Sequence, residues 1–253
     1  ARPRGMVRGM GARGAHERAL MGDDALAPIF PDIHPAERHR FLAARDGSLE
    51  EAVEMLRSHL LWRSAHELAM ANTEDPPPLI GSTLPEFAWA GGTAKDGSRC
   101  VCLRCCLIDL TLGSCEQYVL AFSAFLDGML DRSSDERLTV LVDNRPAEGA
   151  PNMPGIKLLP LGQQMSRTLS DQFPERMARL VVYPVPLALS FIWGLVRPFL
   201  APKTAEKIRM LGGAAGSTSP CPVRLGRYVR LDALREADRP RHAAIEGYRP
   251  EPE

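Results

Sequence analysis

Two short, continuously apolar runs constrain the fold of this chain more than any other feature. They are LTVLVD at residues 138–143 and RLVVYPV at residues 179–185, and the segment between them, 155–173, has the apolar spacing of a helix. A continuous run rich in valine and leucine is typical of a strand covered on both faces. Strand, helix and strand in this order predict a right-handed crossover in a mostly parallel sheet. The sequence therefore predicts an α/β fold with a mostly parallel sheet covered by helices.

Further elements are predicted on both sides of this unit. A turn at Lys95–Gly97 separates two extended pieces within residues 86–105, which predicts a hairpin. Residues 225–241 predict one further strand or helix. Helical spacing recurs in residues 36–45, 48–69, 115–130 and 202–211.

Composition divides the chain into five parts. Three consecutive prolines, Pro76–Pro78, fix φ and remove backbone donors, so they predict a linker. The start of the chain is rich in Arg and Gly, which predicts flexibility; a targeting remnant and a contact with an anionic surface are the alternatives. The predicted parts are a flexible tail (1–30), an N-terminal helical module (31–72), a Pro-rich linker (73–86), the α/β domain (87–240) and a frayed tail (241–253).

Charge and motifs narrow the class of function. The 31 basic residues equal the 31 acidic ones, so no net charge steers the chain onto nucleic acid. The sequence holds no GxSxG, HExxH or P-loop motif and no credible pair of catalytic carboxylates, so we expect neither an enzyme nor catalytic residues. Four cysteines crowd into CVCLRCC at residues 100–106 without a second pair, which favours small apolar residues of a strand over a metal or redox site.

The apolar stretch LALSFIWGLVRPFL, residues 187–200, allows three interpretations: a membrane anchor, a core helix, or a movable wall over an apolar ligand. The longest apolar run, 181–196, contains Pro184 and Pro186 and is followed by Arg197. A spanning helix needs roughly 20 apolar residues without such interruptions, so the anchor is excluded. The other two interpretations stay open on these residues alone.

The flanking motifs carry a resemblance. PERM at residues 174–177, a Trp followed by RPFL, and PKTAEKI at residues 202–208 occur in order, and FLAARDGSLEEAVEMLRSHLLWR lies upstream. Over about residues 36–211 the chain resembles the CRAL-TRIO lipid-binding domains, particularly the phosphatidylinositol-transfer type of the secretory pathway. The resemblance implies an apolar lipid pocket between a sheet floor and a gate helix. The residues that it places in the gate and pocket are Phe191, Ile192, Trp193, Leu195, Val196 and Phe199.

The same resemblance implies residues that bind a headgroup. Glu175 of PERM and Lys207 of the KI pair would contact the inositol headgroup, Thr204 could donate to its phosphate, and Arg45 matches an arginine of the headgroup region. Each residue type also has a plain structural interpretation. Glu175 could pair with a neighbouring arginine, Thr204 could be an N-cap, and Lys207 could lie on a solvated helix face.

Three departures from the family pattern stand out. Asp143-Asn144-Arg145-Pro146 replaces the usual Asp-x-x-Gly after the strand, and the C-terminal Gly-Gly element is absent, which leaves the last strand in question. Leu138 and Val140 are apolar where transfer proteins that also carry phosphatidylcholine have hydroxyl residues, which argues against a choline lipid.

The resulting expectation is a protein that carries or presents phosphatidylinositol. The alternatives are a binder of an isoprenoid or sterol-like hydrophobe, and a protein-interaction module with a vestigial pocket. The expected partners are a phospholipid or other hydrophobic ligand and, transiently, a membrane surface. We expect a cytoplasmic monomer, peripheral at membranes, with a bound lipid, no other cofactor, no metal and no nucleic acid.

Overall fold

The computed structural model describes residues 25–71, 74, 77–185 and 202–250. The chain forms two compact units, which are described separately. Of the described residues, a helical unit comprises those up to Leu68 together with Asp131–Asp135, and an α/β unit comprises those of Ala69–Leu130 and those from Glu136 onward.

The helical unit contains α2 (Pro35–Ala44) and, as far as Leu68, α3 (Leu49–Ala71); the two helices confirm the two helical patterns of the N-terminal module. Its core includes Phe41 and Leu56, together with Leu26 and Phe30. Leu26 and Phe30 fall within the predicted flexible tail, yet both are buried. The packed part of the chain therefore begins before residue 30, because these apolar side chains pack in the same core as residues of α2 and α3.

The loop Asp131–Asp135, which follows α4 in the sequence, also belongs to the helical unit. Arg132 donates from Nε to both carboxylate oxygens of buried Glu37, at 3.0 and 3.1 Å, and His59 Nε2 lies 3.4 Å from the same carboxylate. Burial alone would raise the pKa of Glu37, but hydrogen bonds and charge from His59 and Arg132 lower it to about 2. The carboxylate therefore stays ionised and holds this loop in the unit.

The α/β unit is built on one five-stranded sheet in the order β1-β2-β3-β4-β5. β1 pairs with β2 in an antiparallel hairpin, and β2, β3, β4 and β5 run parallel to one another, as the sequence predicts. The strands are β1 (Ala88–Thr93), β2 (Arg99–Arg104), β3 (Leu138–Asp143), β4 (Met177–Val185) and β5 (Ile208–Gly212).

β5 corrects a prediction. The segment 202–211 was expected to be one helix, but it forms α7 (Pro202–Ala205), a single turn, followed by the strand β5. Ile208 and Met210 are partly buried, Arg209 between them is exposed, and all three pair with β4 in parallel register. Pairing with β4 therefore outweighs the helix propensity of Ala, Glu and Lys in this segment.

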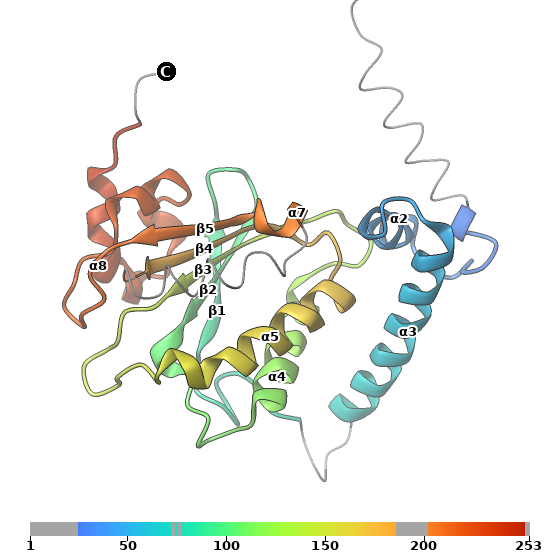
Figure 1. Ribbon diagram of the computed structural model, residues 1–253, viewed down its shortest axis with the longest axis horizontal. Helices are drawn as coiled ribbons and strands as arrows, with labels where there is room; N and C mark the ends of the chain where they lie inside the picture. The colour runs from blue at the N-terminus through green and yellow to red at the C-terminus, as the bar shows by residue number, and fades with distance from the viewer. Residues whose placement is uncertain (1–24, 72–73, 75–76, 186–201, 251–253) are drawn as a thin grey trace, which may run out of the picture. The chain divides into compact units, whose positions relative to one another are not determined.

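Different layers cover the two faces of the sheet. α4 (Cys115–Met129) and α5 (Gly155–Gln172), joined to the strands through the 3-10 helix η1 (Cys105–Leu107) and loops, lie together on one face (Figure 1). On the other face Leu141, Val181 and Tyr183 pack against Leu225 and Ile245 of the C-terminal segment.

The C-terminal segment differs from its prediction. Its elements are η3 (Val223–Arg227), η4 (Leu231–Ala233), η5 (Glu236–Asp238), α8 (Arg239–His242) and η6 (Ala243–Gly247), without a strand among its described residues. Residues from 241 onward were expected to fray, but His242 and Ile245 are buried. The packed domain thus extends past residue 240, because these side chains seal one face of the sheet.

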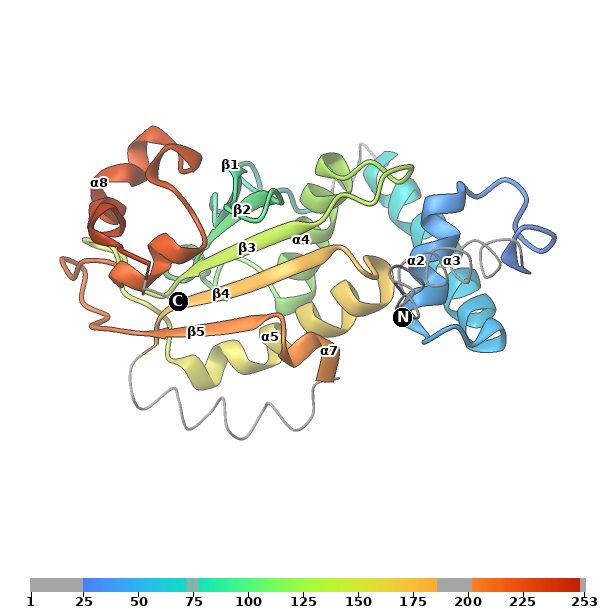
Figure 2. The same ribbon diagram turned by 90° about the horizontal axis from the view of Figure 1, so that it is seen from above.

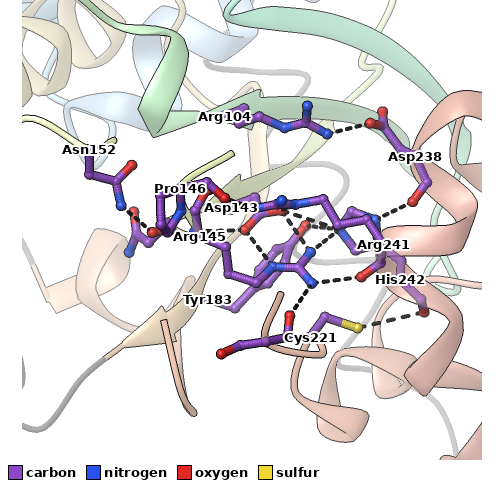
Figure 3. Close-up of polar contacts among 12 residues, drawn as sticks. Arg104, Asp143, Arg145, Pro146, Asn152, Tyr183, Cys221, Asp238, Arg241 and His242 are labelled. Carbon is purple, nitrogen blue, oxygen red and sulfur yellow. Dashed lines mark hydrogen bonds and ion pairs between the residues drawn. The ribbon is translucent and has the colours of Figure 1, made fainter. Parts of the chain in front are cut away.

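A buried ion pair fastens this segment (Figure 3). Arg145, whose exposed fraction is 0%, donates from Nε and Nη2 to the two oxygens of Asp143 at 2.9 and 2.7 Å. Its Nη1 reaches the carbonyl of Arg241 at 2.6 Å, and Arg241 in turn donates to Asp143 and to the carbonyls of Arg145 and Pro146. The remade turn after β3 and the altered C-terminus are therefore two halves of one network.

His242 completes the network as a neutral side chain. Its Nδ1 faces the carbonyl of Asp238 at 2.7 Å, so Nδ1 must donate and Nε2 must accept. Tyr183 and Arg145 lie 2.9 and 3.1 Å from Nε2 as its donors. Burial, with the charge of Arg145, lowers the pKa of His242, which keeps the ring neutral.

Replacing Asp143 tests this fastening. Asp143→Asn leaves the buried Arg145 without its counter-charge, which should lower the free energy of unfolding by about 3–5 kcal/mol in urea titrations. Asp232→Asn is the matched control, because Asp232 pairs with Arg230 at 3.2 Å on the surface of the same unit. Removing that exposed pair should cost less than about 1 kcal/mol. An equal loss of unfolding free energy in the two variants would contradict the structural role of the buried pair.

Candidate functional site

Six side chains on the face shared with α4 and α5 form what we call the apolar floor. The register of β3, β4 and β5 aligns them in two rows across the strands. All six are partly exposed, whereas Leu141, Val181 and Leu211 on the opposite face are buried. The rows are Val140–Leu180–Ile208 and Val142–Val182–Met210.

The floor extends beyond the helices that share its face. Val140 packs against the core of α4 and α5, while Leu180, Val182, Ile208 and Met210 belong to neither core cluster of the α/β unit among the described residues. Their side chains carry no group that can donate a hydrogen bond. A hydrocarbon that covered the six would gain on the order of several kcal/mol from the area it removes from water.

A charged pair lies at one end of this floor. Glu175 precedes β4 and Lys207 precedes β5, so both lie at the amino edge of the parallel strands. Lys207 Nζ is 3.2 Å from Glu175 Oε2, and the two side chains are 25% and 26% exposed. The Lys207 carbonyl accepts from the Leu180 N–H at 3.0 Å, which ties the pair to the first row of the floor.

Glu175 occupies a costly backbone position. The Arg176 N–H donates to the Phe173 carbonyl at 3.3 Å, so Phe173–Arg176 is a β-turn with Pro174 in its second place. Glu175, in the third place, has φ +57°, which is the geometry of a type II turn and usually requires Gly. A side chain there costs about 1–2 kcal/mol. Such strain at a residue with a charged, accessible side chain supports a functional role for that side chain.

The structural interpretations that the sequence allowed, an arginine partner for Glu175 and a solvated helix face for Lys207, differ from what the structure has. Glu175 pairs with Lys207, while Arg176 donates to the Glu136 carbonyl and Arg179 pairs with Asp96. Lys207 lies between α7 and β5, on no helix.

Thr204 lies inside α7, so it is not an N-cap, and its carbonyl accepts from the Lys207 N–H at 3.0 Å. It therefore shares a turn with the charged pair. Arg45 caps the C-terminal end of α2 in the helical unit, which is described on its own. The predicted gate and pocket residues, Phe191, Ile192, Trp193, Leu195, Val196 and Phe199, lie outside the described residues.

The cysteine cluster lies elsewhere. Cys100 and Cys102 point from β2 into the core under the C-terminal segment. Burial raises the pKa of Cys100 to about 11 and that of Cys102 further, so both thiols stay protonated. Across the described ranges, no three His, Cys, Asp or Glu side chains converge as metal ligands. Over the same ranges, each helix is too short or too polar to span a bilayer.

The family resemblance implied a sheet floor, but the sequence did not identify the residues that form it. The signal for the floor was the alternation of Ile208 and Met210 with Arg209, which a strand produces and which the helical interpretation of 202–211 hid.

Comparisons with known proteins show relatives that the chain resembles in sequence. It is 26% identical to Protein real-time of Aedes aegypti over 195 residues, which cover 69% of this chain and 28% of that protein. It is 25% identical to Patellin-4 of Arabidopsis thaliana over 205 residues, which cover 77% of this chain and 36% of that protein. The chain thus spans little more than a third, or less, of the length of these curated relatives.

A solved structure agrees with the fold. The crystal structure of Sfh5 superposes with a TM-score of 0.57 at 11% identity, over 81% of this chain and 82% of that one. The sequence model of the CRAL/TRIO domain matches residues 86–220, more than half of the chain. This chain therefore belongs to the CRAL/TRIO domain family.

Proposed function

We propose that this chain binds a lipid and transfers it or presents it to another protein, and that the lipid is phosphatidylinositol. The observation that carries the proposal is the apolar floor with Glu175 and Lys207 at its amino edge. An amphiphile needs both parts: an apolar surface for its hydrocarbon and polar groups at one end for its head.

The charged pair suits an inositol phosphate head. Lys207 has three N–H donors and can bind a phosphate oxygen, and the Glu175 carboxylate can accept from ring hydroxyls. At 3.2 Å the two side chains satisfy each other, and at about a quarter exposed they can still reach a ligand. A phosphodiester and a hydroxyl would then replace one ion pair with two charge-assisted interactions.

The carrier role needs no bond chemistry. Its work is to shield hydrocarbon from water, at about 0.8 kcal/mol for each buried methylene, and to release it elsewhere. We propose a non-enzymatic, monomeric protein of the cytoplasm that meets membranes transiently.

A neutral hydrophobe, of the isoprenoid or sterol class, is the second candidate. The observation in its favour is that the six floor residues offer no polar group, and that Glu175 and Lys207 neutralise each other. A neutral cargo would leave that pair intact.

Native mass spectrometry after exposure to mixed cellular lipids tests the assignment. Wild type should hold one phosphatidylinositol per chain, and Lys207→Ala should load it about tenfold less well, because a charge-assisted hydrogen bond is lost. Lys203→Ala is the matched control, a nearby lysine in α7, and should load normally. A neutral adduct insensitive to Lys207→Ala would establish the second candidate. A folded chain that retains no lipid would favour an interaction module.

Two substitutions of Glu175 separate its side chain from its backbone strain. Glu175→Ala and Glu175→Gly both remove the carboxylate, so both should reduce phosphatidylinositol loading equally. Only glycine relaxes the positive φ, so the Gly variant should be about 1 kcal/mol more stable than the Ala variant in urea titrations. Equal stability would refute the strained turn, and loading at the wild-type level would refute the headgroup role.

A further inference from the structure

The first two turns of α5 have apolar side chains on the outer side of the helix as well as on the inner side. Leu158, Leu161, Met165 and Leu169 face inward and pack in the core with α4. A helix that covers a sheet is expected to be polar on its outer side. Yet Ile156 is 72% exposed and Leu159 is 36% exposed.

The charged residues within this stretch of the sequence have a single sign. Residues 149–170 contain no Asp or Glu, although the whole chain has 31 of them, and they contain the cations Lys157 and Arg167. Lys157 lies between the two exposed apolar side chains and is itself exposed. Among the described residues, no carboxylate forms an ion pair with it.

The position of this patch separates it from the charged pair of the floor. α5 runs opposite to the parallel strands that it connects, so its first turns lie at their carboxyl edge (Figure 2). Glu175 and Lys207 lie at the amino edge. The patch is therefore a second surface feature.

We propose that the first two turns of α5, residues 155–160, dock the chain on an anionic lipid surface. Ile156 and Leu159 enter the boundary between headgroups and acyl chains, and Lys157 lays its apolar stem beside them with its ammonium on the lipid phosphates. The single sign of charge selects an anionic partner. Two apolar side chains that project singly suit a disordered lipid boundary better than a shaped protein groove.

Flotation of the full chain with vesicles tests the docking surface. The probes are vesicles of phosphatidylcholine alone and of phosphatidylcholine with phosphatidylserine in a two-to-one ratio. Wild type should bind the second kind more strongly. Replacing both Ile156 and Leu159 with Gln should weaken that binding about tenfold or more. Lys157→Gln should weaken it about fivefold and abolish the preference for the anionic vesicles.

Leu112→Gln is the control, because Leu112 is an exposed leucine of the same unit outside α5. It should bind like wild type. The substituted positions are on the surface, so unchanged circular dichroism is expected, and lipid loading in native mass spectrometry reports the floor independently.

Three outcomes would overturn the proposal: no binding of wild type to either kind of vesicle, equal vesicle binding by all variants, or a loss of vesicle binding in Leu112→Gln as large as in the α5 variants. Self-association of wild type that the double substitution abolishes, without vesicle binding, would instead assign the patch to a second copy of the chain.

Discussion

The buried pair of Asp143 and Arg145 determines how the α/β unit uses the two faces of its sheet. Arg145 binds Asp143 through two hydrogen bonds and also holds the backbone of Arg241, nearly a hundred residues further along the chain. Burying two charges is favourable only when both are fully hydrogen-bonded, and here they are. The pair therefore keeps the C-terminal segment on one face, where Leu225 and Ile245 seal the strands.

With one face sealed, we propose the partly exposed part of the other face as the place where a ligand binds. α4 and α5 cover its first strands, and the floor residues of β4 and β5 stay partly exposed. Parallel pairing sets Glu175 and Lys207 side by side, since each precedes its strand by one or two residues. An apolar surface with a charged end thus follows from strand register alone, which is why a carrier of amphiphiles is the function that this geometry supports best.

How far the sequence predicts this structure depends on whether an element is fixed by a local sequence pattern or by contacts with residues elsewhere in the chain. β3, β4 and α4 were predicted closely, because the continuous apolar runs of the two strands and the helical apolar spacing of α4 are local features of the sequence. β5 was predicted as a helix because the Ala, Glu and Lys residues just before it favour a helix, and its pairing with β4 does not show in the local pattern. In the sequence, the link from Arg145 to Arg241 appeared only as two separate departures from the family pattern. These are the changed turn after β3 and the absent C-terminal Gly-Gly element. Glu175 and Lys207 were found through the family resemblance, and their strained turn and mutual contact were not foreseen.

Photo-crosslinking tests the central claim, that the partly exposed half of the sheet is a hydrocarbon floor. The full chain would be loaded with a phospholipid that carries a diazirine on its acyl chain, irradiated, digested and mapped by mass spectrometry. The account predicts adducts on the peptides that contain Val182 and Met210, which lie side by side in the second row. Adducts confined to the C-terminal segment, residues 223–247, would place the ligand on the sealed face and contradict the account.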